Sequence, residues 1–150
     1  PEKLEGAYLF LEDVQDPGNV GTIIRTADAA GYQGVFISSH SADIYNLKTL
    51  RSMQGSHFHL PIYRVSREDM LALARQSDLQ ILASTLSEDS VDYQKVEKHE
   101  DFLLVMGNEG QGISQEMTDA ADVLVHISMK GQAESLNVAV AAGILMFALS

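Results

Sequence analysis

Short apolar segments alternate along the chain with longer segments whose apolar residues recur at helical spacing. The short segments are rich in β-branched and aromatic residues and are bounded by turn-forming residues, which is typical of β-strands. On this pattern strands are expected at residues 8–11, 34–38, within 60–65, at 79–84, 102–106 and 123–127. The run at 102–106 contains no polar residue, and such strands suit a sheet that is covered on both faces.

Helices are expected between these strands, where apolar residues lie three and four positions apart. The first is predicted over 20–30, with Gly31 as its C-cap. Another begins at Ser66 as N-cap and runs to about Gln76, with Glu68 and Asp69 in its first turn. Further helices are predicted at 43–51, 114–121 and 135–149.

This order of elements predicts an α/β fold with a mostly parallel sheet and helices on both faces. The length of 150 residues is that of one domain. Residues 135–149 are almost wholly apolar, but the run is shorter than the roughly 20 residues that span a membrane. We therefore expect this helix to be buried in the core, in a subunit interface, or in both.

The net charge of the chain limits the kinds of molecule that it can bind. Ten basic and 21 acidic residues give a formal net charge of −11, which argues against a domain that binds nucleic acid by its charge alone. The charge is uneven, because residues 48–75 hold five basic and two acidic residues, whereas 86–122 hold two basic and ten acidic ones. One face can therefore attract an anion. Cysteine is absent and the first residues carry no secretory signal pattern, so we expect a cytoplasmic protein without a thiolate metal site.

Two polar segments each precede a predicted helix. The first, around Asp16-Pro17-Gly18-Asn19, leads into a helix whose free N–H groups could bind an anion, with Arg25 two turns further on. Equally, Asn19 could only cap this helix and Arg25 be a solvated surface residue. The second segment carries Ser135 and Asn137 at the start of the last helix, where they could be caps or parts of a site.

A third segment, Gly107-Asn108-Glu109-Gly110-Gln111-Gly112, follows the apolar strand at 102–106. Glycines at the end of a strand permit a close approach of the backbone to a ligand, although many such loops are only turns. The glycines of neither loop match the G-x-G-x-x-G spacing of dinucleotide-binding folds, which weakens the alternative of a nucleotide-binding oxidoreductase. His57 and His59 are interpreted as surface or core histidines.

Taken together, three motifs resemble those of one enzyme family. N-x-G-x-x-x-R-T near the start, M-G-N-E-G-x-G at a strand end and E-S-L-N-V-A-V-A-A-G in the last helix are similar to the motifs of the SpoU–TrmH family. These enzymes are S-adenosylmethionine-dependent RNA ribose 2′-O-methyltransferases of the SPOUT class. Residues 48–58 also resemble the family, and the resemblance runs from about Tyr8 to the end.

The resemblance implies a SPOUT-type fold with a C-terminal trefoil knot, an obligate homodimer, an rRNA or tRNA substrate and no metal. It places the donor, S-adenosyl-L-methionine, against the backbone of Gly107, Ile127 and Leu136. The neighbouring cofactor contacts that it implies are Thr85, Leu86, Glu109, Gly110, Met129 and Ser135.

The catalytic and architectural polar residues that the resemblance implies are Asn19, Arg25, Glu109, Ser135 and Asn137. Among them Arg25 is expected to activate the ribose 2′-hydroxyl, either by accepting its proton or by binding the adjacent phosphate. The phosphate role is physically easier, because a guanidinium is effectively always protonated in proteins.

The chain departs from the family in two respects. Ser128 occupies a position where the family usually has proline, and no basic N-terminal RNA-recognition domain is present. We therefore expect residues 1–150 to form a catalytic domain whose RNA-binding domain lies outside this sequence. A catalytically inactive SPOUT-like module that binds RNA or a partner is the remaining alternative.

Overall fold

A parallel sheet forms the centre of the computed structural model, which describes residues 3–150. Its strand order is β3-β2-β1-β6-β4-β7-β5, and every neighbouring pair is parallel. The strands are β1 (Ala7–Leu11), β2 (Gly34–Ile37), β3 (Ile62–Arg64), β4 (Gln80–Ser84), β5 (Val91–Asp92), β6 (Phe102–Met106) and β7 (Val123–His126). The two-residue strand β5 was missed by the sequence pattern, because it lies in a polar, acidic stretch.

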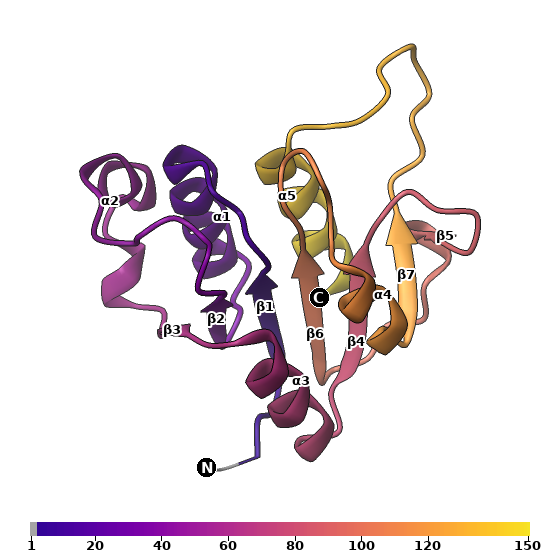
Figure 1. The fold of residues 1–150 in the computed structure, drawn as a ribbon, viewed down its shortest axis with the longest axis horizontal. Coiled ribbons are helices and arrows are strands. Elements are labelled where there is room, and N and C mark those ends of the chain that lie inside the picture. The colour runs from indigo at the N-terminus through magenta and orange to yellow at the C-terminus, as the bar shows by residue number, and fades with distance from the viewer. Residues whose placement is uncertain (1–2) are drawn as a thin grey trace.

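Helices cover both faces of this sheet, as Figure 1 shows. They are α1 (Pro17–Ala29), α2 (Leu47–Met53), α3 (Arg67–Gln76), α4 (Gln115–Ala120) and α5 (Val138–Leu149), with 3-10 turns η1 (Ser56–Phe58) and η2 (Tyr93–Lys95). Helices α1 and α5 pack on one face, and α3 and α4 pack on the other. The predicted α/β fold with a parallel sheet and helices on both faces is thus confirmed.

Alternate residues of the central strands supply the two apolar cores. Leu9 and Leu11 of β1 face α1 and α5, whereas Phe10 between them packs with Met70 of α3. All of these side chains are essentially inaccessible to solvent. This alternation explains why β1 and β6 have no polar face in the sequence.

Several predicted helix ends shift in the structure. The first helix begins at Pro17 and ends with Ala30 as C-cap, while Gly31 follows in the left-handed conformation at φ 78°. The helix expected at 43–51 begins only at Leu47, because Asp43 bonds the Tyr45 N–H in a turn and Asn46 is the N-cap. The strand expected within 60–65 is confirmed at Ile62–Arg64.

The last helix also begins later than expected, at Val138, and it is not buried on every side. Its inner residues pack into the core, but the exposed fractions of Val140 and Phe147 are 51% and 57%. Besides α1, this helix contacts η2, which belongs to the segment between β4 and β6. That packing is compatible with threading of the C-terminal segment, but the knot itself stays a prediction.

The carboxyl ends of the parallel strands meet at one edge of the sheet. Along the chain, β2 and β3 extend the sheet on one side of β1, whereas β6, β4, β7 and β5 extend it on the other. Ligands of α/β sheets bind at such an edge, where the direction of winding changes. The segments that leave β1, β4, β6 and β7 at this edge carry the residues that the sequence singles out (Figure 1).

Two kinds of feature are absent from residues 3–150. None of the helices there has the length and apolar character needed to cross a membrane. No group of three or more histidine, aspartate or glutamate side chains in that range is arranged to hold a metal ion.

Candidate active site

Asp16, and not Asn19, caps the first helix. The Asp16 carboxylate accepts a hydrogen bond from the Asn19 N–H at 3.0 Å, and Pro17 occupies the first helical turn. The interpretation of Asn19 as a simple cap is therefore wrong. Its side chain is left free to bind other segments of the chain.

Asn19 connects the two other motif segments through its side-chain amide. Its Nδ2 donates to Glu109 Oε2 at 3.4 Å, and its Oδ1 accepts from Asn137 Nδ2 at 3.2 Å. These residues lie 90 and 118 positions away from Asn19 along the sequence. The structure thus brings three of the five predicted catalytic residues into one hydrogen-bonded group.

The side-chain amide of Asn137 uses its oxygen and its nitrogen for different contacts. Its Oδ1 accepts from the N–H groups of Ala139 and Val140 at 2.8 and 3.2 Å, so it is the N-cap of α5. Its Nδ2 is the group that binds Asn19. Ser135 lies two residues before this cap, is exposed, and its side chain makes no hydrogen bond within residues 3–150. Of the two roles left open for Ser135, cap or part of a site, it is therefore not the cap.

Glu109 is held by backbone N–H groups of the loop after β1. Its carboxylate accepts from Gln15 N at 3.1 Å and from Asp16 N at 2.8 Å. Partial burial would raise the pKa of Glu109, but these bonds and the one from Asn19 outweigh it and lower the pKa. Glu109 is therefore an ionised acceptor at neutral pH, suited to fixing loops and poorly suited to accepting a proton.

The remainder of the glycine loop is fastened to the same segment. Asn108 and Gly112 exchange backbone hydrogen bonds of 3.1 and 2.9 Å, and Asn108 Nδ2 donates to the Asp13 carbonyl at 2.8 Å. Beyond the loop, the buried carboxylate of Glu12 accepts from the N–H and the hydroxyl of Ser114 at 2.7 and 2.6 Å. The loop is thereby fixed at both ends to the segment that precedes α1.

Gly107 is required by the loop itself. A Cβ at this position would lie 2.3 Å from the Gly112 carbonyl carbon and 2.4 Å from the Ile113 nitrogen. The close approach that glycine permits is thus between two parts of the backbone. A side chain at this position would therefore meet the loop backbone itself.

A polar groove of about 440 Å³ runs along this hydrogen-bonded group. Four of the five predicted catalytic residues line it, and the complete lining is Asp16, Asn19, Glu109, Ser135, Leu136, Asn137 and Val138. Arg25 is not among them. It lies about 9 Å further along α1 than Asn19, given 1.5 Å per residue. Arg25 is exposed, and its side chain makes no hydrogen bond or ion pair within residues 3–150.

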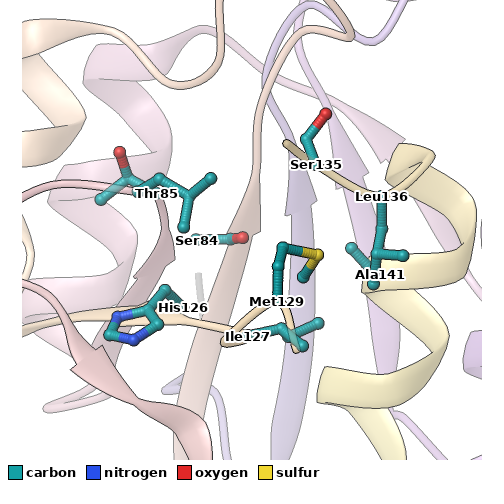
Figure 2. Close-up of a pocket in the computed structure, with 9 residues that line it drawn as sticks. Ser84, Thr85, His126, Ile127, Met129, Ser135, Leu136 and Ala141 are labelled. Carbon is teal, nitrogen blue, oxygen red and sulfur yellow. The ribbon is translucent and has the colours of Figure 1, made fainter. Parts of the chain in front are cut away.

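An apolar cavity of about 120 Å³ adjoins this groove. Ser135 and Leu136 line both spaces. Figure 2 shows Thr85 and Ser84 on one side, Ser135, Leu136 and Ala141 on the other, and Ile127 and Met129 between them. Such a volume is below the roughly 300 Å³ of sites that enclose a whole small ligand, so the cavity suits one part of a ligand that extends into the groove.

Six of the nine predicted cofactor contacts line the cavity, namely Thr85, Leu86, Ile127, Met129, Ser135 and Leu136. Gly107, Glu109 and Gly110 do not, since they belong to the glycine loop. The sequence analysis missed Ser84, His126 and Ala141. Ser84 and His126 are the last residues of β4 and β7, so their position at strand ends was the available signal.

The backbone around the cavity is free to bind a ligand. Gly107, Ile127 and Leu136, where the resemblance predicts backbone contacts, make no backbone hydrogen bond within residues 3–150. Gly107 is buried, and buried backbone groups are normally paired. An apolar slot with unpaired backbone groups fits the adenosine part of an S-adenosyl donor.

The two histidines of the η1 region lie outside the groove and the cavity. His57 packs against the Phe58 ring with centroids 4.1 Å apart, and His59 Nδ1 lies 3.5 Å from Asp28 Oδ2. These contacts agree with their interpretation as surface and core residues.

Comparison with known proteins shows to which family the chain belongs. The model described as the SpoU rRNA Methylase family matches residues 6–147. The chain belongs to the SpoU rRNA Methylase family. The resemblance of the three motifs to SpoU–TrmH enzymes is thereby confirmed.

One relative within this family is the 23S rRNA (guanosine(2553)-2′-O)-methyltransferase RlmP of Bacillus subtilis (strain 168). It is 43% identical over 150 residues, which are 99% of this chain and 60% of RlmP. The chain thus spans less than two thirds of the length of this curated relative.

Solved structures of SpoU-type proteins share the fold. An AdoMet-bound rRNA methyltransferase from Sinorhizobium meliloti superposes with a TM-score of 0.93 at 40% identity, over 99% of this chain and 57% of that one. The SpoU methyltransferase AviRb from Streptomyces viridochromogenes, in complex with AdoMet, gives 0.86 at 34% identity, over 99% and 58%. None of these three relatives is an oxidoreductase, so that alternative loses its support.

Proposed function

We propose that this chain is the catalytic domain of an S-adenosyl-L-methionine-dependent RNA ribose 2′-O-methyltransferase. The observation that carries the proposal is the convergence of Asn19, Glu109 and Asn137 beside an apolar cavity with unpaired backbone groups. Family membership and the rRNA methyltransferase relatives support the same activity.

In this proposed function, different residues of the chain bind the donor and position the ribose. The cavity holds the adenosine part of the donor between Thr85 and Leu136, with backbone contacts at Ile127. The bound donor supplies an electrophilic methyl group. Asn19, Glu109 and Asn137 keep the groove in shape beside it, so that the ribose hydroxyl is held in line, and positioning of this kind supplies much of the acceleration.

RNA is the second substrate, and cations beside the groove would bind its phosphates. The Cε of Lys48 lies 3.4 Å from the point where a Cβ on Gly18 would be, so this side chain reaches the first turn of α1. Arg25 is exposed two turns further on and is unpaired within residues 3–150. Its planar guanidinium can bind a phosphate with two hydrogen bonds and polarise the adjacent 2′-hydroxyl.

The relatives support a choice between the possible RNA substrates. RlmP is named for 23S rRNA, so an rRNA substrate is the first choice and tRNA the second, in the cytoplasm in either case. Because the chain spans 60% of RlmP and carries a charge of −11, a further basic domain is expected to contribute to RNA affinity. The inactive-module alternative is not favoured, since the full polar set is present.

A second copy of the chain is the remaining partner. Val140 and Phe147 of α5 are seven residues apart, so both lie on one side of the helix, and about half of each side chain is exposed. Thr26 of α1 packs against Gly143 of the same helix. The homodimer is proposed to bury this face of α5 together with part of α1.

Ligand titration tests the donor site directly. Isothermal titration of the protein is expected to show binding of S-adenosylhomocysteine and none of NAD, because the loops lack a dinucleotide motif. NAD binding without S-adenosylhomocysteine binding would overturn the proposed function.

A further inference from the structure

A chain of four side chains connects the segment after β4 to the end of β7. Ser90 Oγ and His126 Nδ1 are 2.8 Å apart, and His126 Nε2 and Ser128 Oγ are 3.2 Å apart. Ser128 Oγ in turn donates to Asp92 Oδ2 at 2.7 Å. We call these residues, Ser90, Asp92, His126 and Ser128, the edge network.

Both serine hydroxyls of the edge network donate their protons to acceptors other than His126. Ser90 donates its proton to the Ser87 carbonyl at 2.7 Å, and Ser128 donates its own to the Asp92 carboxylate. Neither hydroxyl has a proton left for the imidazole. The His126 ring thus bridges two hydroxyls whose own protons are bound elsewhere.

The edge network lies directly behind the apolar cavity. Ser84, Thr85 and Leu86 begin the segment that carries Ser90 and Asp92, and they line the cavity on one side. Ile127 and Met129 flank Ser128 and line it on another. Figure 2 shows the His126 ring directed away from Leu136 and Ala141, toward the outer edge of the sheet.

Little else fastens this edge. Strand β5 is two residues long, and its pairing with β7 consists of Val91 with Val125 and Asp92 with His126. An edge strand this short forms few backbone bonds. The side-chain bonds of the edge network therefore hold the two cavity walls at a fixed separation.

We propose that Ser90, Asp92, His126 and Ser128 are positioning residues for the methyl-donor cavity, an assignment that rests on the proposed function. Ser90, Asp92 and Ser128 lie outside the cavity lining, and only His126 reaches it. The four residues fix the distance between the Ser84–Leu86 segment and the Ile127–Met129 segment, and thereby set donor affinity.

The electrostatics of the edge network agree with this geometry. Hydrogen bonds from Ser128 and from the Gln94 N–H lower the pKa of Asp92, with smaller contributions from the charges of His126 and Lys95. Asp92 is therefore a carboxylate that accepts the Ser128 proton across the neutral range. Asp92 and Lys95 are the charged groups that line the same groove as the His126 ring.

Donor binding by three variants tests the proposal. Asp92→Asn and Ser128→Ala each remove one bond, and they are expected to raise the dissociation constant for S-adenosylhomocysteine about five- to tenfold with little change in melting temperature. Ser128→Thr keeps the hydroxyl and should retain wild-type affinity. Gln94→Ala is the matched control, because its side chain lines the same groove outside the network.

Rescue by the conservative variant Ser128→Thr separates positioning from a merely structural role. His126→Gln should also bind S-adenosylhomocysteine more weakly, because the amide cannot reproduce both contacts of the ring. Unchanged affinity in Asp92→Asn and Ser128→Ala, or an equal loss in Ser128→Thr, would overturn the proposal. Failure of the wild-type protein to bind S-adenosylhomocysteine would instead overturn the proposed function.

Discussion

At the scale of single residues, the site depends on amides that serve two purposes. Asn137 caps α5 with its oxygen and binds Asn19 with its nitrogen. Asn19, relieved of capping by Asp16, joins Asn137 to Glu109. Side chains of this kind connect the ends of helices to other residues of the proposed site. A substitution can therefore affect stability, activity or both.

Two substitutions of Asn137 separate these effects. Asn137→Asp keeps the capping oxygen and loses the donor to Asn19, so methyl transfer should fall by about tenfold or more while melting temperature stays nearly constant. Asn137→Ala loses both functions and should also cost about 1 kcal/mol of unfolding free energy. Thermal unfolding and methyl-transfer rates check the pair. Full activity of Asn137→Asp would show that the Asn19 contact is dispensable.

At the scale of elements, the glycine loop owes its shape to its own backbone. Gly107 packs against Gly112 and Ile113, while Asn108 and Glu109 fasten the loop to the segment before α1. The contacts that shape the loop at the carboxyl edge are thus made by the protein's own residues.

Gly107→Ala is therefore expected to destabilise the protein and weaken donor binding together. The added methyl group would overlap loop backbone and cost about 1–3 kcal/mol. Gly131→Ala is the control, because its Cβ would meet no atom within 4 Å. Calorimetric unfolding and titration with S-adenosylhomocysteine measure both effects. A Gly107→Ala protein of wild-type stability would contradict the loop geometry.

The sequence predicted the elements with a strong hydrophobic pattern and missed those that depend on distant partners. The apolar strand at 102–106 and the Ser66 cap of α3 lie where expected. Capping remained an alternative role for Asn19 in the sequence, because both Asp16 and Asn19 can cap a helix, and only the structure shows that Asp16 does so. Strand β5 could not be predicted, since its pairing partner lies 34 positions away in Val91–Val125.

The candidate site was found only by resemblance. Spacing alone left Ser135 and Asn137 as possible caps and Arg25 as a surface residue. The contact between Asn19 and Asn137 crosses 118 positions, and no local pattern reports such a distance. The strand-end position of His126 and the unusual Ser128 were visible in the sequence, but their contact with Ser90 and Asp92 was not, because it forms only when β5 pairs with β7.

At the scale of the whole molecule, α5 carries the surface on which the proposal of a homodimer rests. Val140 and Phe147 remain half exposed although the helix is the most apolar segment of the sequence. An apolar face next to a site is typical of an interface.

The homodimer has a simple test. Sedimentation at micromolar concentration should give twice 16.4 kDa, and the double variant Val140→Asp, Phe147→Asp should give a monomer, since charges cannot be buried unpaired in an interface. Tyr63→Ser is the control, because the exposed fraction of Tyr63 is 51% and it lies on the edge strand β3. A monomeric wild-type protein, or a dimer that survives the double variant, would refute the proposed interface.

The central claim is that this site methylates ribose, and methyl transfer to RNA measures it most directly. With labelled S-adenosylmethionine and rRNA, followed by mapping of 2′-O-methyl nucleotides, the wild-type protein should modify ribose and leave the bases unmodified. Arg25→Lys should bind S-adenosylhomocysteine normally yet transfer at least about 100-fold more slowly, a loss of some 2.7 kcal/mol of transition-state stabilisation. A label found on bases, or an Arg25→Lys variant with wild-type transfer, would contradict this account.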